Sequence, residues 1–417
     1  MVISNKNMVF LIIVVLTGVI SLAISIFRLD PIWIAMSVFY IFLMYGLTKI
    51  EETFYREINL DTLKKDLFIL TLFPLLAGSA GIGRLIETSL VLGDITFIFL
   101  SSLFAFIILL LIDDLTDLRS NRLFAVSFVI SFTISAGTLF IIIRYFTDIY
   151  MDTSYLRGNT HLMFYLLMLS ILSVIIGLGF NDYILSSEYF MLENIRSDPE
   201  VRAPDREVRK EFLNVLNILF GRYNNIWLDI GSRILQLSIV AIVIYGIYSS
   251  RWPVIAWGIF SMIFAFSPDM FRINTGVRSP SLISIWITSL LFIFAFGRPM
   301  RFYGIFDWWA GFTHFLAGSA VSILVFSSFI YINRKLENLF IPIWLLLLLV
   351  LLSISPIGII WEISEFIIDR LLDTSIQAGL DDTIYDLICN FFGSLFTVVL
   401  IYLTLLKECR ELNKLSL

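Results

Sequence analysis

The stretch WEISEFIIDRLLDTSIQAGLDDTIYDLICNFFGS, residues 361–394, joins two apolar runs and decides how the end of the chain folds. It carries seven carboxylates, yet one apolar run (341–363) leads into it and another (384–406) leads out of it. Each run is long enough to cross a bilayer, which takes about 20 apolar residues in a helix. We therefore expect a helical hairpin whose acidic turn lies where lipid gives way to water.

The rest of the chain has the same character. Of its 417 residues, 59% are hydrophobic and only 15% are charged, and the mean hydropathy is +0.91. A soluble domain could not bury this much apolar surface, so the composition predicts a polytopic membrane protein. The net charge of −5 gives no reason to expect a nucleic-acid partner. The expected partners are membrane lipids and a small-molecule or lipid substrate.

About twelve apolar runs have roughly the length of a membrane span, which predicts an all-α helix bundle. The first, 8–27, is expected to be a retained span and not a signal peptide. A polar segment, 184–227, divides the runs six and six and is expected to be a cytoplasmic linker with a short helix. The predicted spans are 8–27, 31–49, 66–83, 92–113, 123–146, 161–181, 229–249, 253–268, 279–297, 309–332, 341–363 and 384–406.

The distribution of Lys and Arg predicts the orientation. With twelve spans, most of these residues fall in the loops that share a side with both termini and the linker. Positively charged loops remain in the cytoplasm. The protein is therefore expected in the cell membrane with both termini cytoplasmic and the loop 373–382 outside. Cys389 and Cys409 are about 30 Å apart along the last helix and are not expected to form a disulfide.

The two halves, 1–183 and 228–417, resemble each other. At a constant offset of 221, residues 137–166 align without gaps on 358–387, and eight of these thirty positions are identical. The tripeptide Asp-Thr-Ser at 152–154 aligns on the one at 373–375. We therefore predict two tandem six-helix repeats with the same orientation in the membrane.

The aligned halves differ in their charged residues. The N-terminal half has other residues where the C-terminal half has acids, so a single site is expected in the C-terminal half. The aligned pairs are Ile141 with Glu362, Arg144 with Glu365, Thr160 with Asp381, His161 with Asp382 and Tyr165 with Asp386.

Three segments of the C-terminal half carry the candidate site residues. His314 lies early in the tenth span, and Glu362 and Glu365 share a face of the eleventh at spacing i, i+3. In the twelfth, Asp382, Asp386 and Asn390 form a stripe at i, i+4 and i+8. Ionisable groups inside a membrane are usually paired or functional. Carboxylates with an imidazole suit Mg²⁺, Mn²⁺, Zn²⁺ or iron, so His314, Glu362, Glu365 and Asp386 are predicted metal ligands and Asp382 a catalytic base.

Structural explanations remain open for several of these residues. Asp382 could cap the twelfth helix, and His314 could be an ordinary packed histidine. Glu365 could pair with Arg370. Asp369 and Asp373 fit solvated loop acids, because the other half has them too. Gly318 and Gly393 could serve only to let helices approach closely.

At these residues the C-terminal half resembles the YjdF-like family of inner-membrane proteins of unknown function. The matching motifs are His314-Phe315 with Gly318, the pair Glu362 and Glu365, and the run Gln377, Asp382-Thr383, Asp386-Leu387, Asn390 and Gly393. A weaker similarity is to VanZ-like membrane proteins. The resemblance implies a polar site that also includes Gln377, Asp381 and Asn390. This chain departs from the family pattern at Ala310, where the family has an acid four residues before the histidine.

The sequence leaves three functions open. The first is a metal-dependent enzyme acting on lipid head groups or lipid-linked phosphates, although no P-S-G-H motif is present. The second is a proton- or cation-coupled transporter, since tandem repeats with intramembrane acids are common there. The third is a structural membrane protein whose acids organise loops.

Overall fold

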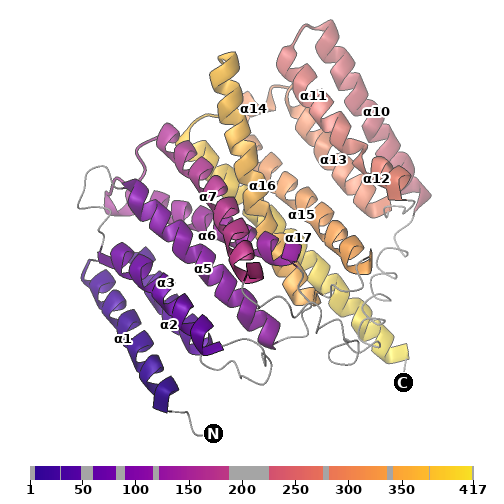
Figure 1. Ribbon diagram of the computed structural model, residues 1–417. Coiled ribbons are helices and arrows are strands. Elements are labelled where there is room, and N and C mark those ends of the chain that lie inside the picture. The colour runs from indigo at the N-terminus through magenta and orange to yellow at the C-terminus, as the bar shows by residue number, and fades with distance from the viewer. Residues whose placement is uncertain are drawn as a thin grey trace. The chain divides into compact units, whose positions relative to one another are not determined.

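The computed structural model describes residues 5–28, 30–47, 60–80, 90–115, 122–186, 225–275, 281–335, 341–374 and 376–415. Every regular element in these ranges is a helix (Figure 1). Most of the predicted linker 184–227, including its expected short helix, lies outside the described residues. The helices are α1(Asn5–Phe27), α2(Pro31–Leu47), α3(Leu60–Ala80), α5(Leu90–Leu115), α6(Arg122–Met151), α7(Asn159–Ser186), α10(Ile226–Tyr248), α11(Trp252–Ala265), α12(Ser267–Thr275), α13(Ser281–Gly297), α14(Phe302–Ile305), α15(Trp309–Lys335), α16(Ile343–Leu372) and α17(Leu380–Leu415).

These helices have the apolar length that a membrane requires. Among the described residues, eight spans are long and apolar enough to cross it, and four further apolar helices are shorter. The shorter ones are Ile12–Phe27, Pro31–Leu47, Leu67–Ala80 and Ser281–Gly297. Many large apolar side chains are exposed, among them Phe42, Tyr248 and Trp252. Such surfaces are stable in lipid and not in water. The all-helical, multi-pass class predicted from composition is confirmed.

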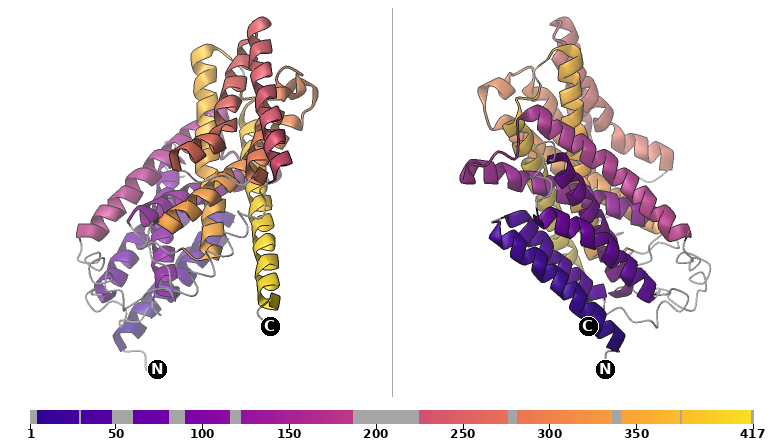
Figure 2. Two further views of the ribbon diagram at one scale, coloured as in Figure 1. Left: turned by 90° about the vertical axis from the view of Figure 1, so that its right-hand side faces the viewer. Right: turned by 60° about the vertical axis from the view of Figure 1, so that its left-hand side comes forward.

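The chain divides into two compact units. One contains Met1–Ala203, Leu336–Leu345 and Ser355–Ile384, and the other contains Pro204–Lys335, Leu346–Ile354 and Tyr385–Leu417. In the first unit, α1 packs against α2 and α3, and α5 packs against α3, α6 and α7 (Figure 1). In the second, α10 packs against α11 and α13, and α13 packs against α15. Helix α17 is a long, unbroken helix (Figure 2).

Small residues bring α15 and α17 into close contact. A Cβ atom at Gly318 would collide with the backbone of Asn390, and one at Gly393 would collide with the backbone of Phe315. Below this contact, Ser319 Oγ and Thr397 Oγ1 are hydrogen-bonded at 2.7 Å. Small residues and buried hydroxyl pairs are the usual means of helix association in lipid. The packing role considered for Gly318 and Gly393 therefore agrees with the structure, and it holds the polar positions of both helices at close range.

Two loops are organised in the same way by an aspartate. Asp148 accepts hydrogen bonds from the Thr153 hydroxyl and from the backbone of Tyr155 and Leu156. Asp369 accepts from the Thr374 hydroxyl and from the backbone of Ile376 and Gln377. Asp152 and Asp373 both have φ of 51°, the left-handed conformation that Asp tolerates better than most residues. Asp369 and Asp373 thus have structural roles, as their presence in both halves had suggested.

Candidate metal site

His314 and Asp386 form one part of the site. His314 lies in the second turn of α15, and its Nε2 is 3.2 Å from Asp386 Oδ2, in the second turn of α17. Their side chains are 12% and 4% exposed. The other ring nitrogen, Nδ1, is 3.2 Å from the Asn390 amide, one turn after Asp386 on α17. The predicted stripe on α17 thus presents Asp386 and Asn390 to the same imidazole.

Glu362 and Gln377 form the other part. Glu362, on α16, is fully buried, and its Oε2 accepts a hydrogen bond of 3.2 Å from Gln377 Nε2. The same Nε2 donates to Thr383 Oγ1, and Gln377 Oε1 accepts from Asn159. The second oxygen of Glu362, Oε1, is buried without a hydrogen-bond partner among the described residues. A buried carboxylate oxygen left in this state is costly, so it marks a position where a ligand would be stabilised.

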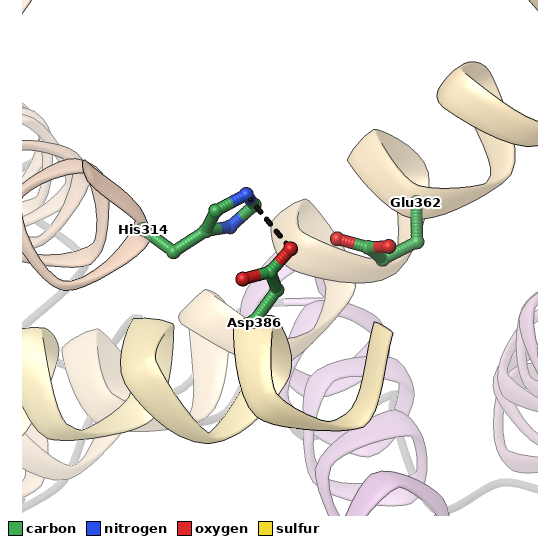
Figure 3. A group of neighbouring side chains, drawn as sticks. All are labelled: His314, Glu362 and Asp386. Atoms are coloured by element: carbon green, nitrogen blue, oxygen red, sulfur yellow. Dashed lines mark ion pairs between the residues drawn. The ribbon is translucent and has the colours of Figure 1, made fainter. Parts of the chain in front are cut away.

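His314, Glu362 and Asp386 together are a group that could hold a metal ion. Each offers one ligand atom, and these atoms lie within 4.8 Å of one another. Figure 3 shows the carboxylates of Glu362 and Asp386 and the imidazole pointing toward one another. One nitrogen and two carboxylate oxygens are a donor set used by Zn²⁺, Mn²⁺ and iron, and three protein ligands leave positions open for water or substrate. The donor chemistry and the unpaired Glu362 oxygen both fit a divalent cation.

The contact between Asn390 and His314 affects how the imidazole could bind a metal. If the Asn390 NH₂ donates to Nδ1, the imidazole proton is on Nε2, which faces Asp386. Binding a metal through Nε2 requires the proton on Nδ1, which needs the oxygen of the Asn390 amide as acceptor. The two ends of the amide are nearly the same size, so a half-turn of this side chain supplies it. Asn390 can therefore support either tautomer.

The remaining predicted site residues are not among these three clustered ligands. Glu365 is buried, at 6% exposure, but it is not one of the three clustered ligands. Asp382 is half-buried, and its Oδ2 accepts a hydrogen bond from the Ala378 backbone at the start of α17. Asp382 is the third residue of α17, so this contact resembles the N3 half of a capping box and not the N-cap role considered for Asp382. Asp381 is exposed. The Arg370 guanidinium lies near the Thr160 hydroxyl and over the Phe366 ring.

A second buried charge cluster, in the N-terminal half, was not predicted. Arg144 Nη1 and Asp94 Oδ1 form an ion pair at 2.6 Å, and the two side chains are 9% and 3% exposed. The guanidinium also lies 3.9 Å from the centre of the Phe140 ring. Arg144 falls inside the predicted span 123–146, and the structure buries it there against Asp94. The available signal was Asp94, an acid three residues inside a predicted span, where an unpaired charge is unfavourable.

Comparison with known proteins finds a family match in the C-terminal half of the chain. Residues 231–407 match the family described as "Predicted membrane protein (DUF2238)". An uncharacterized protein of Thermotoga maritima is 27% identical over 139 residues, which cover 33% of this chain and 70% of that protein. No solved structure matches the chain. The C-terminal half, with all three clustered ligands, is thus similar to a family of predicted membrane proteins.

Proposed function

We propose that this is a metal-dependent enzyme of the cell membrane, acting on a lipid head group or a lipid-linked phosphate. The observation that carries the proposal is the convergence of His314, Glu362 and Asp386, whose ligand atoms lie within 4.8 Å of one another. All three come from apolar helices, where ionisable groups are rare unless they have a function. A divalent cation would balance two buried carboxylates that otherwise repel each other.

The chemistry follows from the donor set. When bound, Zn²⁺, Mn²⁺, Mg²⁺ or iron would polarise a phosphoryl oxygen or lower the pKa of a bound water. Gln377 would orient Glu362 through its hydrogen bond to Oε2, leaving Oε1 for the cation. Asn390 would orient the His314 ring. Partners of this kind fix the direction of metal ligands.

Asp382 is the proposed general base. It lies four residues before Asp386 on α17, so both side chains are on the same face of the helix. Glu365 is the candidate for a further ligand, since it is buried one turn beyond Glu362 on α16. The charge distribution of the loops supports an outward-facing site with both termini cytoplasmic. Lipids of the outer leaflet would then be the accessible substrates.

We further propose that the two halves are copies of one six-helix unit. Several features recur at the offset of 221 that the alignment suggested. Helices α1 and α6 have the same limits as α10 and α16 after this shift. The loop contacts of Asp148 recur at Asp369, and the positive φ of Gly158 recurs at Gly379. These coincidences support a repeat in which only the C-terminal copy kept the metal ligands.

The test is the metal content of the purified protein. We expect about one Mn²⁺, Zn²⁺, iron or Mg²⁺ per chain by plasma mass spectrometry after equilibration with each metal. Glu362→Gln and Asp386→Asn should each lose it, because an amide is a far weaker ligand than a carboxylate. Asp381→Asn, which alters an exposed acid beside the site, is the matched control and should retain the metal.

The outcomes separate the candidate functions. Metal lost only from the two ligand variants, together with release of phosphate or head group from outer-leaflet lipids, supports the enzyme. Metal that binds but crosses the membrane of proteoliposomes down its gradient would replace the enzyme with a cation transporter. A wild-type protein that binds none of the four metals would overturn the metal site and leave a structural or proton-linked role.

A further inference from the structure

The second compact unit contains a polar cavity that the metal site does not use. It has a volume of about 240 Å³ and lies among α10, α12 and α13. It is lined by Asp229, Ser232, Arg233, Gln236, Pro268, Asp269, Arg272 and Ser284. On α10 the lining begins one turn after the helix start and continues to Gln236, which lies about 15 Å along the axis from the first residue of the helix. The cavity therefore runs from the end of the helix into its apolar part.

One wall of the cavity is a fixed network of charged and polar groups. Asp269 accepts hydrogen bonds from both terminal nitrogens of Arg233, at 2.6 Å for Nη1 and 2.5 Å for Nη2. Gln236, which is 4% exposed, accepts from Arg233 and donates to Asp269 and to the Ala265 backbone. A bidentate Arg–carboxylate pair held by a buried amide has a defined orientation. Arg233 is 51% exposed and Asp269 22%, so the buried amide of Gln236 is the anchor of this wall.

Ser232 supplies an unsatisfied group in the same lining. Its residue is 4% exposed, and its Oγ has no hydrogen-bond partner among the described residues. Ser238, further along α10, instead bonds to the carbonyl of Ile234. A buried hydroxyl without a partner is unfavourable unless a ligand or water satisfies it. The Ser232 hydroxyl therefore indicates a ligand with a polar group that can form a hydrogen bond.

The charges of the residues that line the cavity determine which kind of polar group fits. Two arginines, Arg233 and Arg272, face two aspartates, Asp229 and Asp269, so the lining has no net charge. A simple anion would be attracted by the two arginines and repelled by the two aspartates, and a simple cation the reverse. A ligand that carries both charges complements both kinds of residue. A phosphate beside an ammonium group meets this requirement.

The surroundings of the cavity indicate that the ligand is a lipid. Helices α10 and α12 also carry exposed apolar side chains, including Trp227 at 74%, Ile234 at 58%, Met270 at 58% and Ile273 at 76% exposure. In a bilayer such side chains contact acyl chains. We propose that this cavity binds the zwitterionic head group of a phospholipid, with the acyl chains along these apolar faces.

The experiment uses the full-length protein in detergent and counts bound lipid by native mass spectrometry. The probes are dihexanoyl phosphatidylethanolamine, dihexanoyl phosphatidylglycerol and soluble phosphoethanolamine. We expect one phosphatidylethanolamine per chain and at least about tenfold weaker binding of phosphatidylglycerol, whose head group lacks the ammonium charge. Ser232→Leu, which fills the cavity, should abolish binding, and Ser232→Ala should weaken it. Ser238→Leu, on the same helix but outside the cavity lining, should bind as the wild type does.

Three results would overturn the inference. Equal affinity for phosphatidylglycerol would exclude recognition of a zwitterion. Undiminished binding by both Ser232 variants would place the lipid elsewhere. Phosphoethanolamine binding as tightly as the lipid would show that the cavity serves a soluble zwitterion, since the acyl chains would then contribute nothing. None of these results depends on the metal site, because no cavity residue is among its ligands.

Discussion

The N-terminal and C-terminal halves each bury a cluster of charged side chains, and the two clusters differ in where their positive charge comes from. In the N-terminal half, Arg144 pairs directly with Asp94. In the C-terminal half, the group of His314, Glu362 and Asp386 consists of two carboxylates and one imidazole. The first cluster is balanced by the chain itself, whereas the second has donor atoms suited to an added cation.

The proposed repeat makes this difference instructive. At the offset of 221, Arg144 aligns with Glu365 and Ile141 aligns with Glu362. Asp94 lies one position from the residue that aligns with His314. A reversal of charge at one position and the loss of a carboxylate at another would convert a metal site into an internal ion pair. The N-terminal cluster would then contribute stability and the C-terminal cluster function.

The largest expected effect tests the internal ion pair. Arg144→Met removes the cation and leaves Asp94, which is 2% exposed, without its partner. Loss of one member of a buried pair typically costs about 3–5 kcal/mol in the free energy of unfolding. We expect a correspondingly large fall in the thermal midpoint in detergent.

Two controls accompany this variant. Arg370→Met removes an exposed arginine and should change stability little. The double variant Asp94→Asn, Arg144→Met should recover most of the loss, because no unpaired charge remains. If Mn²⁺ or Zn²⁺ restored the thermal stability of Arg144→Met, the distinction between the two clusters would fail.

Metal removal tests the other side of the comparison. At a metal concentration of 100 times Kd, wild-type protein should gain about 2.7 kcal/mol in the free energy of unfolding. A chelator should reverse the gain, as measured by thermal unfolding. Glu362→Gln should show no metal-dependent shift, whereas Arg144→Met should keep it. If Glu362→Gln were stabilised by metal as much as the wild type is, Glu362 would not be a metal ligand.

A smaller effect is expected from the residue that orients the imidazole. Asn390→Leu removes the amide 3.2 Å from His314 Nδ1 and should weaken metal binding by about 10–100-fold. Competition with a chelating dye would measure the change. Phe392→Leu, which alters an exposed side chain on the same helix, should leave affinity unchanged. Equal affinities for the two variants would mean that Asn390 supports packing alone.

The smallest effects test what the halves share. Asp148→Asn and Asp369→Asn each replace a carboxylate that accepts three hydrogen bonds with an amide that keeps one acceptor oxygen. Each should lower the free energy of unfolding by about 1 kcal/mol, and by similar amounts. Asp152→Asn is the control, because Asn also tolerates the left-handed conformation. Clearly unequal losses would argue against a common loop design.

The helices were predictable because their cause is local. An apolar run of sufficient length must satisfy its own backbone hydrogen bonds in lipid, and a helix does so within the segment. The run 309–332 accordingly lies within α15, and α16 begins two residues after the start of the run 341–363 and includes the rest of it. The break between α11 and α12 at Phe266 was not predicted, because the apolar pattern continues across it.

The candidate site was predictable only in part. Spacing along α17 placed Asp386 and Asn390 on one face, and both meet His314. Spacing along α16 could not choose between Glu362 and Glu365, and the structure brings Glu362 into the ligand group. Which of the two side chains faces the other ligands depends on how α16 is rotated about its axis relative to the neighbouring helices. No single segment specifies this rotation.

The sequence by itself therefore determined the membrane class, the approximate helix limits and the segments that carry the acids, because these depend on composition and on helical periodicity. Only the tertiary structure decided which acids meet. Asp94 and Arg144 are 50 residues apart, and His314 and Asp386 are 72 apart. Such pairs form through the packing of separate helices, where close contacts such as that at Gly318 set the register. Helical spacing shows which side chains share a face of one helix, whereas the packing of helices determines which residues of other helices they contact.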